Sequence, residues 1–443
     1  LCRYPRGGAV MAAPLRKDEA RVAVTEARIA ALGRPQGGFS APARKDALAR
    51  LRAMGLPGRR DEYWRWTDPA AFNAPEPQGG AALRVDKPIF EGRDKIRLVF
   101  VDGVFDADAS DDPRIAGVEI ERLAEADRAD IHWAKALYGV LEAEGQSPVA
   151  RPFAALNTAA ATDGLLIRVT GRAAIPLHIS YRQGSERSDA VLHHVIRLEP
   201  GAELTVLETG TAGARSNLVM EVDMGEGARL HHLRPQGRAL DRAMITHLFA
   251  RVAAGALFKS FTLTANGRLT RNEAVIRIAG DGAVAHVAGA ALGDGADGPF
   301  QHDDTIFITH AAEGCESRQV FKKVLRHGAK GVFQGKILVK PGAQKTDGYQ
   351  ISQSLLLDDD SQFLAKPELE IYADDVKCSH GSTTGAIDET ALFYLRSRGV
   401  PRAEATALLV LSFVADAIAE IEDADLASDI VARIEDWLAQ RQG

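Results

Sequence analysis

The segments EPGAELTV (residues 199–206), GEGARLHH (225–232) and GDGAVAHV (280–287) share one local pattern. In each, turn residues lead to a glycine and an alanine, and alternating strand-forming residues follow. A glycine followed by a small residue recurs at steps of 26, 28, 27, 32 and 28 residues. A nearly constant step of roughly 20 to 50 residues indicates a solenoid. The six pairs are Gly201-Ala202, Gly227-Ala228, Gly255-Ala256, Gly282-Ala283, Gly314-Cys315 and Gly342-Ala343.

The segments between these glycines alternate with a period of two, which indicates strands rather than amphipathic helices. The sequence therefore predicts a mainly β fold, a parallel β-helix in which each step is one coil. Glycine adopts the positive φ that the bend needs, and the small residue after it packs where coils stack. A β-sandwich also has short alternating strands, but nothing in it requires such regular spacing.

The first part of the chain is predicted to be helical. We expect residues 1–94 to form an N-terminal helical domain with helices over 18–32 and 41–55. Trp64 and Trp66 would anchor this region to the next one, and a linker would follow over residues 73–90. Because Met11 is a candidate start, residues 1–10 are expected to be an upstream extension.

The β-helix is predicted over residues 95–385, interrupted by a helical insertion near 131–145. A C-terminal helical domain is predicted over residues 386–443, where Asp388 is a candidate N-cap. Its segment 402–421 is apolar almost all round between Ala405 and Ala415. Such a helix is buried in its own protein or covered by a partner.

The composition excludes several function classes. A net charge of −6 and a pI near 6.1 give no basic surface for nucleic acid. No apolar run reaches the roughly 18 residues of a membrane helix. Three cysteines, at 2, 315 and 378, cannot form a disulfide framework and point to a reducing cytoplasm. Gly335-Lys336 lacks the other residues of a phosphate-binding loop, so we expect no nucleotide to be bound by this chain.

The commonest activity of a β-helix, polysaccharide cleavage by a lyase or hydrolase, is the enzymatic alternative. It requires carboxylates grouped on one strand face. Asp303 and Asp304, like Asp374 and Asp375, are adjacent and would point to opposite faces. The adjacent histidine pairs 193–194 and 231–232 fail as metal chelates for the same reason. His302 and His310 would share a face but lie about 26 Å apart.

The segment DDVKCSHGSTTG (374–385) is different, because Cys378 and His380 would lie on one strand face with Cβ atoms roughly 6–7 Å apart. A thiol and an imidazole so placed could share a metal or a partner's cluster, and a charged imidazole would lower the pKa of the thiol. The structural alternative is a buried cysteine beside a capping histidine.

Four segments resemble the SufB/SufD family of iron–sulfur cluster assembly scaffolds, in its SufD form. They are EYWRWTDPAAF (62–72), PFAALNTAAATDGLLIRV (152–169), the run from Phe333 to Ile371, and PELEIYADDVKCSHGSTTGAIDETALFYLRSRGV (367–400). The resemblance implies a right-handed parallel β-helix between two helical domains. The C-x-H-G motif and the small number of cysteines point to the SufD form rather than the SufB form. Residues 1–40 carry no family signature.

The resemblance also implies a non-enzymatic scaffold subunit that pairs with a SufB-like subunit along the terminal coils, or with itself in isolation. A SufC-like ATPase, which would hydrolyse the ATP, is expected on the C-terminal helices. Cys378 and His380 would lie at the heterodimer interface, offer ligands to iron or sulfide, and hold an iron–sulfur cluster transiently. A structural carrier of the ATPase with an inert Cys–His pair remains the alternative. The residues expected to contact the ATPase are Phe393, Tyr394, Arg398, Leu409 and Phe413.

Overall fold

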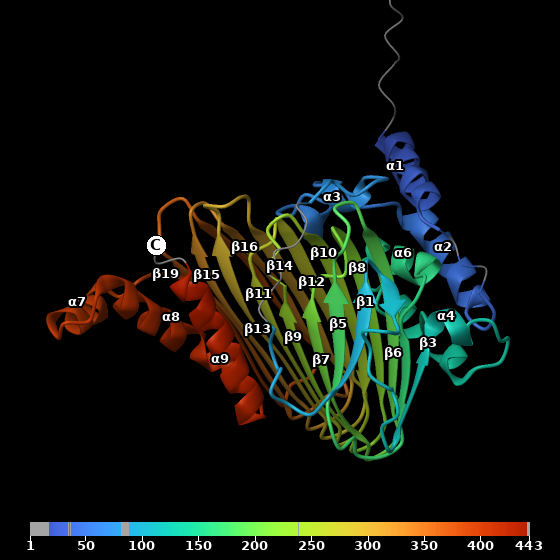
Figure 1. Cartoon of the computed structure of the whole chain (residues 1–443). Helices are drawn as coiled ribbons and strands as arrows, with labels where there is room; N and C mark the ends of the chain where they lie inside the picture. Colours follow the sequence, from blue (N-terminus) through green and yellow to red (C-terminus); the bar gives the residue numbers. More distant parts are fainter. Residues whose placement is uncertain (1–16, 34, 36, 81–87, 238, 441–443) are drawn as a thin grey trace, which may run out of the picture.

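Two sheets of parallel strands, stacked face to face and wound as one β-helix, form the body of the protein (Figure 1). The computed structural model describes residues 17–33, 35, 37–80, 88–237 and 239–440. The expected extension over residues 1–10 lies outside these ranges. Among the described helices, none combines the length and apolar character that crossing a bilayer requires.

Each coil contributes one strand to each sheet, because the chain alternates between them from β4 onward. The β1–β2 and β3–β4 pairs are antiparallel, and the pairs after them are parallel. The ten-stranded sheet contains β1 (Ile96–Val101), β2 (Val104–Asp106), β5 (Leu177–Arg182), β7 (Glu203–Gly210), β9 (Arg229–Gln236), β11 (Leu257–Ala265), β13 (Val284–Asp294), β15 (Glu316–Arg326), β17 (Thr346–Leu356) and β19 (Val376–Ala386). The nine-stranded sheet contains β3 (Val118–Arg122), β4 (Leu165–Val169), β6 (Asp189–Leu198), β8 (Arg215–Met224), β10 (Ala243–Val252), β12 (Leu269–Ile278), β14 (Gln301–His310), β16 (Lys330–Val339) and β18 (Gln362–Ile371).

The predicted period matches the register of the ten-stranded sheet. From β7 to β15, successive register partners lie 26, 28, 27 and 32 residues apart. The first five predicted glycines have positive φ, and the N–H of each donates to a carbonyl of the next coil, as Gly201 does to Glu226 at 2.8 Å. The small residue after each of the five is buried. The repeat that the sequence predicted is confirmed for these five coils.

The sixth predicted position is wrong. Gly342 has no positive φ; Lys345 adopts φ +57° and takes the place of the glycine. Its N–H donates to the Asp375 carbonyl at 2.6 Å, and Gly314 donates to the Gln344 carbonyl just before it. The connection from β16 to β17 covers residues 340–345, whereas that from β6 to β7 covers residues 199–202. The longer connection moves the left-handed position three residues beyond the glycine.

The core lies between the two sheets and runs along the β-helix, where aliphatic side chains alternate inward along each strand. The outer face of the ten-stranded sheet is covered in part by α8 (Arg402–Ile418) and α9 (Ala424–Ala439), which share a second apolar cluster with it. The outer face of the nine-stranded sheet is covered by the inserted helices, on which the N-terminal helices pack.

The insertion is longer and more broken than the single helix predicted near 131–145. It contains α4 (Leu123–Ala126), a 3₁₀ turn (Trp133–Ala136), α5 (Val140–Glu144) and α6 (Pro152–Ala160). Gly139, at φ +73°, separates the turn from α5. Every residue of α6 is buried between α2 and the strands β6 and β8, so α6 lacks the polar face that marks a surface helix.

The N-terminal helices agree with the sequence: α1 spans Lys17–Ala31 and α2 spans Ala41–Met54. A 3₁₀ turn (Glu62–Trp64) and α3 (Ala70–Asn73) follow. Trp64 is buried with its ring centroid 5.3 Å from that of Phe153 and 4.1 Å from the Arg271 guanidinium, which confirms it as an anchor; Trp66 is half-buried. Phe90, at the end of the expected linker, is packed in the cluster that α8 and α9 cover.

The C-terminal helices begin with α7 (Glu389–Ser397), whose predicted N-cap Asp388 accepts from the N–H groups of Thr390 and Ala391. In α8, Val410 and Val414 are buried against the sheet, while Leu408 is 46% exposed on the other side. This helix is therefore covered by its own protein on one face only. Figure 1 shows α7 extending away from the β-helix near its last coil.

Candidate functional site

The last coil of the β-helix leaves a sheet edge open. β19 pairs with β17, and among the described strands none pairs with its other side. The strand is paired in register along its whole length, so alternate residues share one face. Cys378 and His380 both lie on the inward face of this edge strand, as the alternation predicts.

Cys378 is half-buried at the end of the core. Its register partner on β17 is Gly348, and a Cβ at Gly348 would lie 3.2 Å from the Cys378 sulfur. The sulfur also packs against the small cluster that closes this end of the β-helix, around Ile337 and Val339. A side chain at position 348 would therefore crowd the thiol.

His380 continues a polar column that runs along the inside of the ten-stranded sheet. Its register partner is Gln350, and the register partner of Gln350 is Gln319. The two amides are buried, and Gln350 Nε2 donates to Gln319 Oε1 at 2.8 Å. His380 is exposed, because no further coil covers it in the part of the chain that the structure describes.

The lowering of the thiol pKa that a charged imidazole would cause is not found at Cys378 in the isolated chain. Burial raises the pKa of Cys378, the backbone N–H of Gly348 opposes the rise, and the charge of Asp347 adds to it. The other described cysteine, Cys315, is fully buried behind a coil turn, and burial raises its pKa as well. Both thiols are therefore protonated near neutral pH in the isolated chain.

Two histidines and two carboxylates singled out in the sequence make structural contacts. His302 lies inside with Nδ1 2.7 Å from Lys323 Nζ, and His310 Nε2 lies 2.8 Å from Ser317 Oγ. Asp303 points outward to Arg271 at 2.5 Å, and Asp304 points inward to Lys323 at 2.5 Å. The arrangement that a polysaccharide-cleaving enzyme needs is not formed by these carboxylates. Over the described ranges, no group of three or more His, Cys, Asp or Glu side chains could hold a metal ion.

The five residues expected to meet an ATPase divide into two sets. Phe393 and Tyr394, 70% and 59% exposed, lie on α7, and the Arg398 guanidinium lies 4.5 Å from the Tyr394 ring centroid. Leu409 and Phe413 on α8 are half-buried, and Lys322 Nζ of β15 lies 4.9 Å from the Phe413 ring centroid. The first set faces solvent, and in the second Phe413 packs against the apolar cluster that α8 shares with the sheet.

Two exposed apolar residues at the same end were missed in the sequence. Ile371, the last residue of β18, is 39% exposed, and Tyr372 directly after it is 59% exposed. They lie in the coil that leads into β19. The sequence contained a signal for them. Ile371 and Tyr372 form an apolar pair in the last predicted coil, which no later coil would cover.

Comparisons with known proteins agree with this architecture. Residues 181–413 match the family model described as "SUF system FeS cluster assembly, SufBD core domain". The iron–sulfur cluster assembly protein SufD of Escherichia coli is 27% identical over 90% of this chain and 93% of its own length. A SufBD family protein of Synechocystis is 26% identical over 86% of this chain and 88% of its own.

The matched region begins in β5 and ends in α8, so it covers most of the β-helix and the start of its C-terminal cover. It includes the last coil with Cys378 and His380 and exceeds half of the chain. The chain belongs to the SufBD family of the SUF iron–sulfur cluster assembly system, as a SufD-like member.

Proposed function

We propose that this chain is a non-enzymatic scaffold subunit of a cytoplasmic Suf complex and that it presents Cys378 and His380 to a SufB-like partner. The observation that carries the proposal is the open last coil, which places both side chains on an uncovered edge strand. Iron and sulfide would be the substrates assembled there, and the finished cluster would leave.

The character of the edge strand supports a partner. Exposed sheet edges normally carry charges or proline that prevent pairing. β18, which ends the other sheet, carries Pro367 and the charged residues Lys366, Glu368 and Glu370. β19 is longer, and Lys377 is its one charged residue. The edge that bears Cys378 and His380 is therefore the one suited to receive another chain.

The number of donors also supports a shared site. Cys378 and His380 offer one sulfur and one nitrogen, and iron–sulfur clusters are usually held by four ligands. The remaining ligands of the cluster would come from the SufB-like subunit or from small molecules bound beside it. Contact with that subunit would also place a charge or metal beside the Cys378 thiol and lower its raised pKa.

The exposed side chains of α7 are proposed to hold a SufC-like ATPase. Phe393 and Tyr394 are large, exposed and apolar, and Arg398 lies over the Tyr394 ring. Aromatic and arginine side chains of this kind are enriched in interface centres. ATP hydrolysis would then take place in the ATPase. It would move this chain relative to the SufB-like subunit and so expose or cover the side chains of the terminal coils.

The test is the iron and acid-labile sulfide content of the reconstituted three-protein complex. His380→Ala and Cys378→Ala are expected to lower both contents while the complex still assembles on a sizing column. Ser379→Ala is the matched control, because Ser379 is exposed on the opposite face of the same strand. Its contents should equal those of the unmodified chain.

The double variant separates the scaffold from the alternative of a structural carrier. If Cys378→Ala/His380→Ala leaves iron and sulfide unchanged in an intact complex, the pair is inert and the chain is a carrier of the ATPase. If the complex fails to form, the two side chains contribute to pairing, and the contents are then measured on the single variants.

A further inference from the structure

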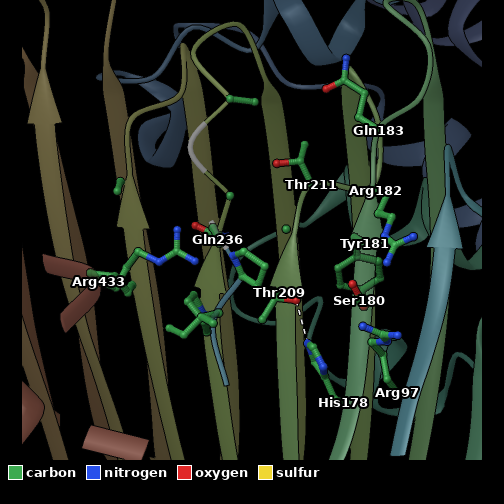
Figure 2. A pocket seen from close by; sticks show the side chains of 18 of the residues that line it. Arg97, His178, Ser180, Tyr181, Arg182, Gln183, Thr209, Thr211, Gln236 and Arg433 are labelled. Carbon is green, nitrogen blue, oxygen red and sulfur yellow. Dashed lines mark hydrogen bonds between the residues drawn. The ribbon is translucent and has the colours of Figure 1, made fainter. Parts of the chain in front are cut away.

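A groove lies on the outer face of the ten-stranded sheet, far along the β-helix from β19. It is formed where α9 leaves the early strands β5, β7 and β9 uncovered (Figure 2). Its volume is about 440 Å³. That volume lies within the range of roughly 300–1,000 Å³ that small-molecule sites occupy.

The charged side chains of the groove are mainly basic. Arg97, Arg182 and Arg433 line it, together with the single acid Glu91. Figure 2 shows Arg97 and Arg182 on one side and Arg433 reaching in from the other. In the part of the chain that the structure describes, neither Arg97 nor Arg182 has its guanidinium in an ion pair with an acid. An unneutralised pair of guanidinium groups beside a cavity favours an anion.

Two buried side chains of the groove have polar atoms without a partner among the described residues. Thr211, 3% exposed, has no hydrogen bond at Oγ1, and His178, 4% exposed, has none at Nδ1. The other nitrogen of His178 lies 2.7 Å from Thr209 Oγ1 (Figure 2). Burial, with the charges of Lys95 and Arg97, lowers the pKa of His178 to about 3, so the imidazole is neutral. Unpaired buried polar atoms are costly and are usually satisfied by a ligand or water.

Part of the groove lining is apolar, beside the polar side chains of Ser180, Gln183 and Gln236. Ile89 and Pro235 line it, as do Leu263 and Ala265 on β11. We propose that this groove binds a small organic anion whose phosphate or carboxylate is held by Arg97 and Arg182. A flat or apolar body would lie against Pro235 and Leu263, and a polar atom of the ligand would meet Thr211.

A long polyanion does not suit this site. The whole chain carries a net charge of −6, and the basic residues converge on one cavity rather than forming a stripe. The strand residues that line the groove lie on or beside the strands from β1 to β11, whereas the proposed assembly site lies on β19. The two proposals therefore rest on different residues and can fail separately.

The test is titration calorimetry on the full chain at low ionic strength with four probes: adenosine monophosphate, citrate, inorganic phosphate and adenosine. One of the two organic anions is expected to bind with one site per chain, and adenosine is expected not to bind. Stronger binding of adenosine monophosphate than citrate identifies phosphate as the group recognised, and the reverse identifies carboxylate. Inorganic phosphate, which lacks the body, should bind more weakly than the organic anion.

Variants tie the binding to the groove. Arg97→Gln/Arg182→Gln should lower the affinity for the organic anion about tenfold or more. Added salt should lower the affinity of the unmodified chain. Thr211→Val should lower the affinity for the organic anion about threefold. It should not lower the unfolding temperature, because the hydroxyl has no hydrogen-bond partner to lose among the described residues. Arg128→Gln, at an exposed position on the insertion, is the matched control and should change nothing.

Absence of binding by all three anions at millimolar concentration would overturn the proposal. So would equal binding of adenosine and adenosine monophosphate, or unchanged affinity in the double arginine variant. If that double variant does not fold, unchanged affinity in Thr211→Val together with insensitivity to salt overturns it.

Discussion

His380 on β19 is the register partner of Gln350 on β17, and it is the exposed end of a buried polar column inside the β-helix. Gln350 Nε2 donates to Gln319 Oε1 one coil earlier, whereas Gln350 Oε1 has no hydrogen-bond partner among the described residues. The imidazole has a neighbouring coil on one side and solvent on the other. The last coil therefore leaves His380 exposed on the side that another coil would cover within the β-helix.

The turns of the β-helix give the first prediction. Gly282 has φ +66° and Gly342 does not have positive φ, and neither would clash through an added Cβ. Gly282→Ala should therefore lower the free energy of unfolding by about 1–2 kcal/mol through backbone strain alone. Gly342→Ala should leave it unchanged or raise it slightly. Denaturant unfolding of the two variants checks this, and equal losses would contradict the register.

These turns also show which parts of the fold could be predicted from the sequence. The glycine–alanine step predicted the coils because every coil repeats one backbone conformation, which only a few residue types adopt easily. It failed at Lys345, where a non-glycine residue takes the left-handed conformation inside a longer connection. α6 could not be distinguished from a buried strand, since a helix buried all round has no polar period.

The candidate site was predictable in part. The face shared by Cys378 and His380 follows from strand alternation, but the direction of the thiol pKa depends on burial of the thiol against the cluster at the coil end. The groove was not predictable, because Arg97 on β1, Arg182 on β5 and Thr211 just after β7 are brought together only by the winding of the chain.

The buried cation inside the β-helix gives the second prediction. Lys323 Nζ lies 2.5 Å from Asp304 Oδ2 and 2.7 Å from His302 Nδ1, and all three side chains are buried. Lys323→Met leaves Asp304 buried without a cation and should cost about 3–5 kcal/mol of unfolding free energy. Denaturant unfolding measures this loss.

Two further variants control that experiment. Lys323→Met/Asp304→Asn removes the unpaired charge and should recover most of the loss. Lys377→Met, at an exposed position of β19, should have an effect near zero. If the single and double variants at the buried site are equally unstable, the ion pair is not the cause.

Thiol labelling gives the third prediction. In a Cys2→Ser background, Cys378 should react with a maleimide faster than Cys315, because Cys378 is half-buried and Cys315 is fully buried. The rate at Cys378 should keep rising above the ordinary thiol pKa, since burial raises its own pKa. A plateau below pH 8 would contradict the raised pKa, and Cys378→Ser identifies the signal.

The exposed helix α7 gives the fourth prediction. Phe393→Ala/Tyr394→Ala should change the free energy of unfolding by less than about 0.5 kcal/mol, because both side chains face solvent. The same double variant should lose co-purification with a SufC-like ATPase. Phe413→Ala is the contrasting control, expected to destabilise the chain, because Phe413 packs against the cluster under α8. Full retention of the ATPase by the α7 variant would contradict the proposed contact.

Amide hydrogen exchange of the β19 peptide, residues 376–386, measures most directly whether the open edge receives a SufB-like subunit. In the isolated chain, β19 amides that do not bond to β17 should exchange quickly. In the complex, we expect these amides to become protected while the exchange of β7 and β9 peptides stays unchanged. Exchange in β19 that is the same with and without the partner, in a complex shown to be intact, would contradict it.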